Sequence, residues 1–164
     1  MRSMLLLAGL MAMTGVPSAA VAAPAEEAAE LTKDTVDYHK DRYKEVEKLA
    51  GQLAKEIDKE KDTQETVQGL KAAYKEELAR LREKGVPTVE DDTPMHPQHA
   101  AYYEGLPEED RTKLVALRDL MVELKGMDVA ERPKPYQSKL AEYVATLKDR
   151  YERKQKSLDE ASDK

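Results

Sequence analysis

Along most of the chain, apolar residues recur at alternating spacings of three and four, which is the period of an α-helix. The first such stripe runs from residue 36 to 57, the second from 67 to 81 and the last from 136 to 158. A further set, between residues 114 and 124, spreads over more than one stripe. No segment alternates as a half-buried strand does. The pattern therefore predicts an all-α protein whose helices bury narrow, coiled-coil-like seams.

Residues that start or stop helices mark the ends of these segments. Gly85, followed by Pro87, has the position of a helix C-cap, and Gly126 is expected to end the next helix. That helix is expected to begin at Pro107, because proline suits the first turn and the acidic residues after it suit the helix dipole. The proline-rich residues 86–106 are therefore predicted to form the longest loop.

The number of helices depends on residues 58–66, which contain no apolar side chain. Either the first helix continues through them or the chain turns there. Asp62 and Glu65 have the spacing of a capping box, which indicates a helix start near Thr63. A connector at residues 127–135 precedes the last helix. The expected fold is a three- or four-helix antiparallel bundle or an extended helical hairpin.

The first 22 residues have the order of a secretory signal peptide: a basic start, an apolar run and a small-x-small end. We expect cleavage to leave residues 23–164 as a single helical domain that is periplasmic or secreted. The alternative is an uncleaved anchor, because residues 4–23 approach the length of a bilayer span. Acidic residues follow the run where a stop-transfer segment would be basic, so no membrane insertion is expected after cleavage.

Charge and composition limit the classes of partner that we expect the chain to bind. The net charge is −6 and the basic residues are scattered, which argues against nucleic acid, whose phosphates need clustered Lys and Arg. Phe, Trp and Cys are absent, so eight tyrosines supply the aromatic packing and no disulfide forms. Seams with so little core predict a protein partner or self-association.

The residues chosen as partner-binding candidates lie on the seams. They are Val36, Tyr43, Val46 and Leu53 of the first helix, with Tyr74 and Tyr143 of later ones. The alternative interpretation is that all six are internal core.

Potential metal ligands gather in one segment, which holds Asp92, Met95, His96 and His99. Imidazole suits Cu and Zn, and a thioether suits Cu(I), so a Cu or Zn site is the alternative to an ordinary polar loop. His39 lies on the first seam, where we expect a packed ring with one nitrogen in solvent. No other cofactor is expected.

No motif for catalysis is found. The chain has no Cys nucleophile, no GxSxG elbow and no glycine-rich phosphate loop. The carboxylates of residues 108–110 are accounted for by the helix start. The sequence therefore predicts a protein that is not an enzyme.

Two short segments resemble the paired Leu-Thr-x-x-Gln motifs of periplasmic helical stress proteins of the Spy/CpxP type. Residues 31–35 read Leu-Thr-Lys-Asp-Thr, with Thr35 in place of the Gln, and residues 106–110 read Leu-Pro-Glu-Glu-Asp. The resemblance implies an all-α, non-enzymatic protein that binds client proteins, with metal binding in some relatives. The expected function is an exported, chaperone-like binding or scaffold protein, and the alternative is a periplasmic Cu- or Zn-binding or metal-responsive protein.

Overall fold

The computed structural model describes residues 31–88 and 94–164, and within these ranges it contains helices and no strand. The all-α prediction is confirmed. The helices are α2 (Lys33–Asp58), α3 (Gln64–Glu83), α4 (Pro97–Gly105), α5 (Glu108–Gly126) and α6 (Pro133–Ser162).

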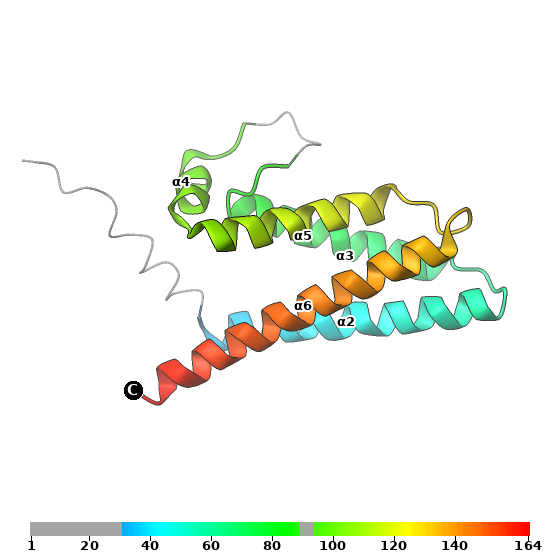
Figure 1. Ribbon diagram of the computed structural model, residues 1–164, viewed down its shortest axis with the longest axis horizontal. Helices are drawn as coiled ribbons and strands as arrows, with labels where there is room; N and C mark the ends of the chain where they lie inside the picture. The colour runs from blue at the N-terminus through cyan, green and yellow to red at the C-terminus, as the bar shows by residue number, and fades with distance from the viewer. Residues whose placement is uncertain (1–30, 89–93) are drawn as a thin grey trace, which may run out of the picture.

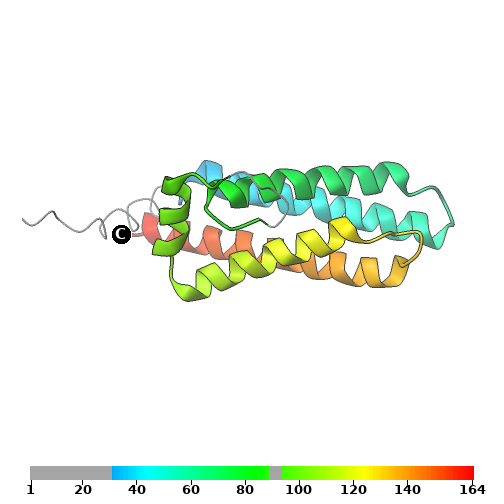
Figure 2. The same cartoon turned by 90° about the horizontal axis from the view of Figure 1, so that it is seen from above.

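The four long helices α2, α3, α5 and α6 lie side by side, and consecutive ones run in opposite directions (Figure 1). Each is in contact with two of the others: α2 with α3 and α6, and α5 with α3 and α6. The short helix α4 crosses one end of the set, where α3 ends and α5 begins (Figure 2). We call this the α4 end. The result is an elongated molecule with one line of core side chains.

The core consists of apolar side chains that recur at helical spacing on all four long helices. Burying such a stripe provides most of the stability of a helix in water, because propensity alone is marginal. The side chains that are completely or almost completely buried include Val46, Leu53, Leu70, Leu81, Leu117, Met121, Leu124, Leu140 and Leu147.

The chain turns between α2 and α3, which decides between the two possibilities for residues 58–66. α2 ends at Asp58 and α3 begins at Gln64. Thr63 is the N-cap residue, although the side-chain bond comes from Asp62, whose carboxylate accepts from the Gln64 amide at 3.0 Å. The predicted helix start near Thr63 is confirmed.

Gly85 ends α3 in the left-handed conformation, with φ of 82°. The Gly85 amide donates to the Arg82 carbonyl at 2.9 Å, and the Val86 amide donates to the Leu81 carbonyl at 3.0 Å. Val86 and Leu81 are both buried. These two bonds and the apolar contact define a Schellman motif, so the C-cap predicted at Gly85 is confirmed.

α2 ends in the same motif without a glycine. Glu60 takes the left-handed position, with φ of 52°, and the Lys61 amide donates to the Glu56 carbonyl at 2.8 Å. A side chain in this conformation costs about 1–2 kcal/mol. The turn therefore contains local strain, and the lack of Gly or Pro is why the sequence did not mark the end of α2.

Two of the predicted boundaries are wrong. Residues 86–106 are not one loop, because they contain α4, and α6 begins at Pro133 inside the predicted connector 127–135. In both cases proline stands in the first turn of the helix, where its missing amide proton is not needed. At α4, the His96 side chain also accepts from the Gln98 amide at 3.3 Å as an N-cap.

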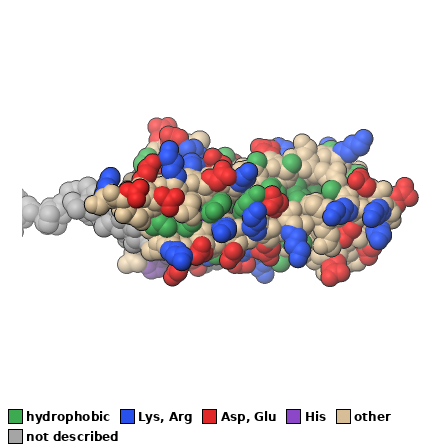
Figure 3. Space-filling model, turned by 90° about the horizontal axis from the view of Figure 1, so that it is seen from below, with side chains coloured by type: hydrophobic (Ala, Val, Ile, Leu, Met, Phe, Trp, Pro, Cys, Tyr) green, Lys and Arg blue, Asp and Glu red, His purple; other side chains and the backbone are tan. Residues whose placement is uncertain are grey.

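The surface carries charges of both signs close together. On the face shown in Figure 3, acidic and basic side chains alternate with small apolar patches. Across residues 31–88 and 94–164, no helix has the length and apolarity needed to cross a bilayer.

Candidate functional site

The six predicted partner-binding residues lie inside the molecule. Val36, Tyr43, Val46, Leu53, Tyr74 and Tyr143 are each at most 5% exposed. The alternative interpretation, internal core, is the one that this burial favours. A partner reaches these side chains only if the helices separate, so any binding surface of the folded chain is elsewhere.

The predicted metal ligands lie before and within α4, except Asp92, which is outside the described residues. Met95 and His99 are half-buried and His96 is exposed. The His96 and His99 rings are 5.3 Å apart, centroid to centroid. In the described part of the chain, no three His, Cys, Asp or Glu side chains come together as a metal site would require.

His39 is 5% exposed on α2, with its ring edge-on to that of Tyr38, so the ring is packed as predicted but lies deeper than the expected position with one nitrogen in solvent. Burial lowers the pKa of His39 to about 2, and the charges of Arg150, Lys154, Lys84 and Arg80 contribute to this shift. The imidazole is therefore neutral in the folded protein. These four cations lie around the α4 end of the core.

A buried ion pair connects α3 and α6 beside His39. Arg150 Nη1 donates to Glu77 Oε1 at 2.7 Å, and the two side chains are 10% and 1% exposed. The Tyr38 hydroxyl donates to the other Glu77 oxygen at 3.0 Å. Because both carboxylate oxygens are used, the pair satisfies the requirement that buried charges be hydrogen-bonded.

Arg42 adds a second ion cluster on the outer side of Tyr38. Its guanidinium contacts Glu76 at 2.6 Å and Glu45 at 2.8 Å. Burial lowers the pKa of Arg42, but its hydrogen bonds with Glu76 and Tyr38 outweigh this and raise it. The Arg80 guanidinium lies 3.5 Å from the centroid of the Tyr38 ring, as a cation–π contact.

Tyrosines in the core differ in whether their hydroxyls are paired. The Tyr74 and Tyr136 hydroxyls form a hydrogen bond of 2.9 Å. The Tyr143 hydroxyl is also buried but has no hydrogen-bond partner among the described residues. Burial and the nearby Glu77 charge raise the pKa of Tyr143.

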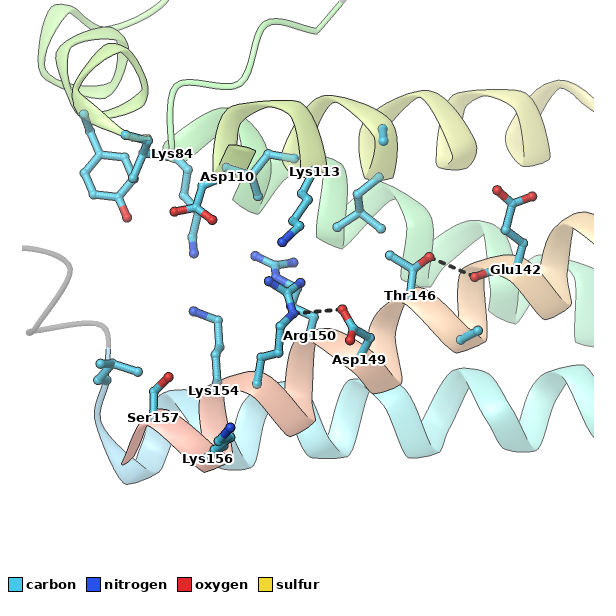
Figure 4. Close-up of a pocket in the computed structure, with 18 of the residues that line it drawn as sticks. Lys84, Asp110, Lys113, Glu142, Thr146, Asp149, Arg150, Lys154, Lys156 and Ser157 are labelled. Atoms are coloured by element: carbon cyan, nitrogen blue, oxygen red, sulfur yellow. Dashed lines mark hydrogen bonds and ion pairs between the residues drawn. The ribbon is translucent and has the colours of Figure 1, made fainter. Parts of the chain in front are cut away.

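A cleft of about 810 Å³ opens between α5 and α6 toward the α4 end. In Figure 1, α6 diverges from α5 in this direction. In Figure 4, side chains from both helices and from the end of α3 are directed into the same space: Lys84, Asp110, Lys113, Arg150 and Lys154. We call this space the α5–α6 cleft. Its volume is in the range of pockets that hold a drug-sized ligand.

The lining of the α5–α6 cleft combines apolar and charged side chains. The apolar ones are Leu31, Leu106, Leu114, Ala116, Leu117 and Ala145. The basic ones are Lys84, Lys113, Arg150, Arg153, Lys154 and Lys156, against the acidic Asp110, Glu142, Asp149 and Glu160. Arg153 is paired with Asp149 at 2.8 Å. The lining thus has two more basic than acidic side chains, although Lys113 and Arg150 are paired with Glu109 and Glu77, which do not line the cleft.

The sequence contained a signal for this site that the search for apolar seams missed. The buried positions of α6 are Tyr136, Leu140, Tyr143, Leu147 and Arg150, spaced by four and three. Lys154 lies four residues after Arg150 and continues this spacing. In these turns α6 directs cations into the space beside α5 (Figure 4). A change from apolar to basic residues along one seam was therefore the available indicator.

Comparison with family models, with curated proteins and with solved structures finds no match for this chain. The function is therefore inferred from the cleft and the polar cluster beside it.

Proposed function

We propose that this protein is an exported, non-enzymatic helical binding protein that holds a short polypeptide segment in the α5–α6 cleft in a chaperone-like manner. The observation that carries the proposal is the cleft itself, which is about 810 Å³ and has leucine and alanine between charged side chains. Binding grooves that take amphipathic segments combine apolar anchor positions with a charged rim in this way.

The size of the cleft favours a segment over a whole folded partner. A stable interface between two folded proteins buries about 1,600 Å² in total. The cleft instead suits a few side chains, and Leu114 and Leu117 at its floor join the apolar core. An extended or unfolded chain offers such side chains one after another.

The remaining parts of the proposal concern location and architecture. Residues 1–22 have the features of a signal peptide, so we place the protein in the periplasm or outside the cell. The contacts among the four long helices favour an antiparallel four-helix bundle. Sequencing the N-terminus of the exported protein tests the first point, with a start at Ala23 expected.

The binding proposal is tested by filling the cleft. Ala145 of α6 lines the cleft and is exposed, and Ala72 is exposed on α3 away from it. Light scattering of an aggregating, reduced client protein is followed with wild type, Ala145→Trp and Ala72→Trp. We expect suppression of scattering by wild type and Ala72→Trp, and loss of suppression by Ala145→Trp.

Two results would contradict the proposal. If wild type does not suppress aggregation, the protein does not bind unfolded clients. If Ala145→Trp suppresses as well as Ala72→Trp, binding does not use the cleft. Far-UV circular dichroism melts confirm that both variants remain folded, and light scattering of the protein alone shows whether Ala145→Trp changes self-association.

Metal binding is the second candidate function, because the His96 and His99 rings lie 5.3 Å apart at the start of α4. Two imidazoles with a Met95 thioether suit Cu(I), whereas a closed zinc site needs four ligands. A melt shifted upward by Cu or Zn in wild type, but not in His96→Ala/His99→Ala, is the expected result for this function. An unshifted wild-type melt would rule it out.

A further inference from the structure

We infer that the α5–α6 cleft selects acidic polypeptide segments. Their carboxylates bind at the α4 end, and their neighbouring apolar side chains pack against the leucines that line the cleft. This inference depends on the proposed polypeptide binding and names the chemistry of the partner. Charge is the first observation in its favour: six basic and four acidic side chains line the cleft. Four of these cations also have carboxylate partners within the chain, Lys113 with Glu109, Arg150 with Glu77, Arg153 with Asp149 and Lys156 with Glu160, so an acidic segment would add to or replace these pairs.

The cations converge at one end of the cleft. Lys84 comes from the end of α3, Lys113 from α5, and Arg150 and Lys154 from α6, and Figure 4 shows all four directed into the same space. The low pKa of His39 supports this convergence, because Arg150, Lys154 and Lys84 are among the charges that lower it. The four cations share this space with the Asp110 carboxylate and outnumber it, which favours a further anion between them.

Arg150 is the most buried of these four cations. One guanidinium nitrogen is fixed by Glu77 at 2.7 Å, and the Arg150 side chain is only 10% exposed while it also lines the cleft. A guanidinium offers five N–H donors in a fixed fork, so the bond to Glu77 leaves donors for another carboxylate. Glu77 thus positions Arg150 and neutralises its charge, while further N–H donors of the guanidinium remain for a ligand.

Apolar side chains line the same cleft as these cations. Leu106 and Leu114 line the cleft with Leu31, and all three are partly exposed. A segment that carries leucine-like residues close to Glu or Asp matches both kinds of lining residue. A basic segment would place its cations against Lys84, Lys113 and Lys154, where like charges repel.

The test uses two fluorescent peptides with identical apolar residues, one with Glu and one with Lys at every charged position. Affinities are measured by fluorescence anisotropy with wild type, with Arg153→Gln/Lys154→Gln, and with Lys134→Gln/Lys148→Gln. The control double variant removes the same charge from exposed positions of α6 outside the cleft.

We expect the Glu peptide to bind wild type and the control alike, and the cleft variant to bind it about 5- to 10-fold more weakly. Added salt should weaken the binding of the Glu peptide more than the binding of the Lys peptide. If both peptides bind equally and Ala145→Trp blocks both, polypeptide binding stands and acidic selection is wrong. If the cleft and control variants lose the same affinity, the basic end is not the determinant. If neither peptide binds wild type, the inference and the proposed function are both wrong.

Discussion

Glu77 and Arg150 form an ion pair of 2.7 Å across the interior of the molecule, although they are 73 residues apart in sequence. Both occupy positions that the helical pattern of α3 and α6 assigns to the core. The pair marks the point where the apolar core gives way to the α5–α6 cleft. Its stability and the binding properties of the cleft are therefore connected.

Removing the charge of Glu77 should destabilise the fold strongly. Glu77→Gln leaves the Arg150 guanidinium buried without a counter-charge, which costs about 3 kcal/mol or more of unfolding free energy. Urea unfolding followed by circular dichroism measures this. The matched control is Glu76→Gln, since Glu76 is 58% exposed and its partner Arg42 keeps Glu45. That variant should lose less than about 1 kcal/mol.

Replacing the whole pair should restore much of the loss. Glu77→Leu/Arg150→Met removes both charges, and such exchanges of buried ion pairs for apolar residues are often neutral. Equal destabilisation by Glu77→Gln and Glu76→Gln, or no rescue by the double variant, would contradict the buried pairing.

The two Schellman turns should respond in opposite directions to glycine. Glu60→Gly removes the strain of a non-glycine residue in the left-handed conformation, but it also gives the unfolded chain more conformational entropy. The net effect should be a stabilisation of about 0.5–1 kcal/mol. Gly85→Ala should destabilise it by at least about 1 kcal/mol. An added Cβ at Gly85 would also collide with the His99 carbonyl of α4. Thermal melts of both variants test this, and a loss of stability in Glu60→Gly would show that the turn is not strained.

The core tyrosines should differ in what their hydroxyls contribute. Tyr74→Phe leaves the Tyr136 hydroxyl buried without its partner, which should cost about 1–2 kcal/mol. Tyr143→Phe removes a hydroxyl without a partner among the described residues, so it should leave stability unchanged or raise it by about 1 kcal/mol. Chemical unfolding of the two variants separates these cases. A large loss in Tyr143→Phe would mean that its hydroxyl is hydrogen-bonded in solution.

Stability should fall as the pH drops below 6.5 because of His39. Its pKa is lowered to about 2 in the folded state, so the unfolded state binds one more proton between pH 6.5 and 2. From pH 7 to pH 5 the loss amounts to about 2 kcal/mol. Desolvation is the main cause, and the cations Arg150, Lys154, Lys84 and Arg80 add to it.

His39→Gln should remove this pH dependence, whereas His96→Asn should keep it, because His96 is exposed and Asn can still cap α4. Denaturant unfolding at pH 7 and pH 5 gives the comparison. A wild-type protein equally stable at both values would place the His39 imidazole in contact with water.

The sequence predicted the helices and several of their ends because these depend on local signals. Gly85 and Gly126 end helices where expected, and the spacing of apolar residues identified the core. The α4 helix was missed because Pro97 acts as a first-turn residue, a role that proline takes only when the next residues are helical. At the α2–α3 turn, Asp62 and Glu65 marked the start of α3, but no Gly or Pro marked the end of α2, where Glu60 takes the left-handed conformation.

The candidate site was less accessible to sequence reasoning. The cleft is lined by Arg150 and Lys154, which continue the α6 seam that holds Tyr143 and Leu147. Arg150 is neutralised by a partner from another helix, Glu77 of α3. Spacing within one helix gives no information about such pairings, and for this reason buried seam residues were predicted to form the binding surface.

The claim that the α5–α6 cleft is the binding site is tested most directly by NMR titration. Amide shifts of the isotope-labelled protein are followed while the Glu peptide is added. Binding in the cleft predicts that shifts concentrate on residues that line it from two helices, such as Leu114, Ala145 and Arg153. Shifts confined to α2 and α3, or none at saturating peptide, would contradict it.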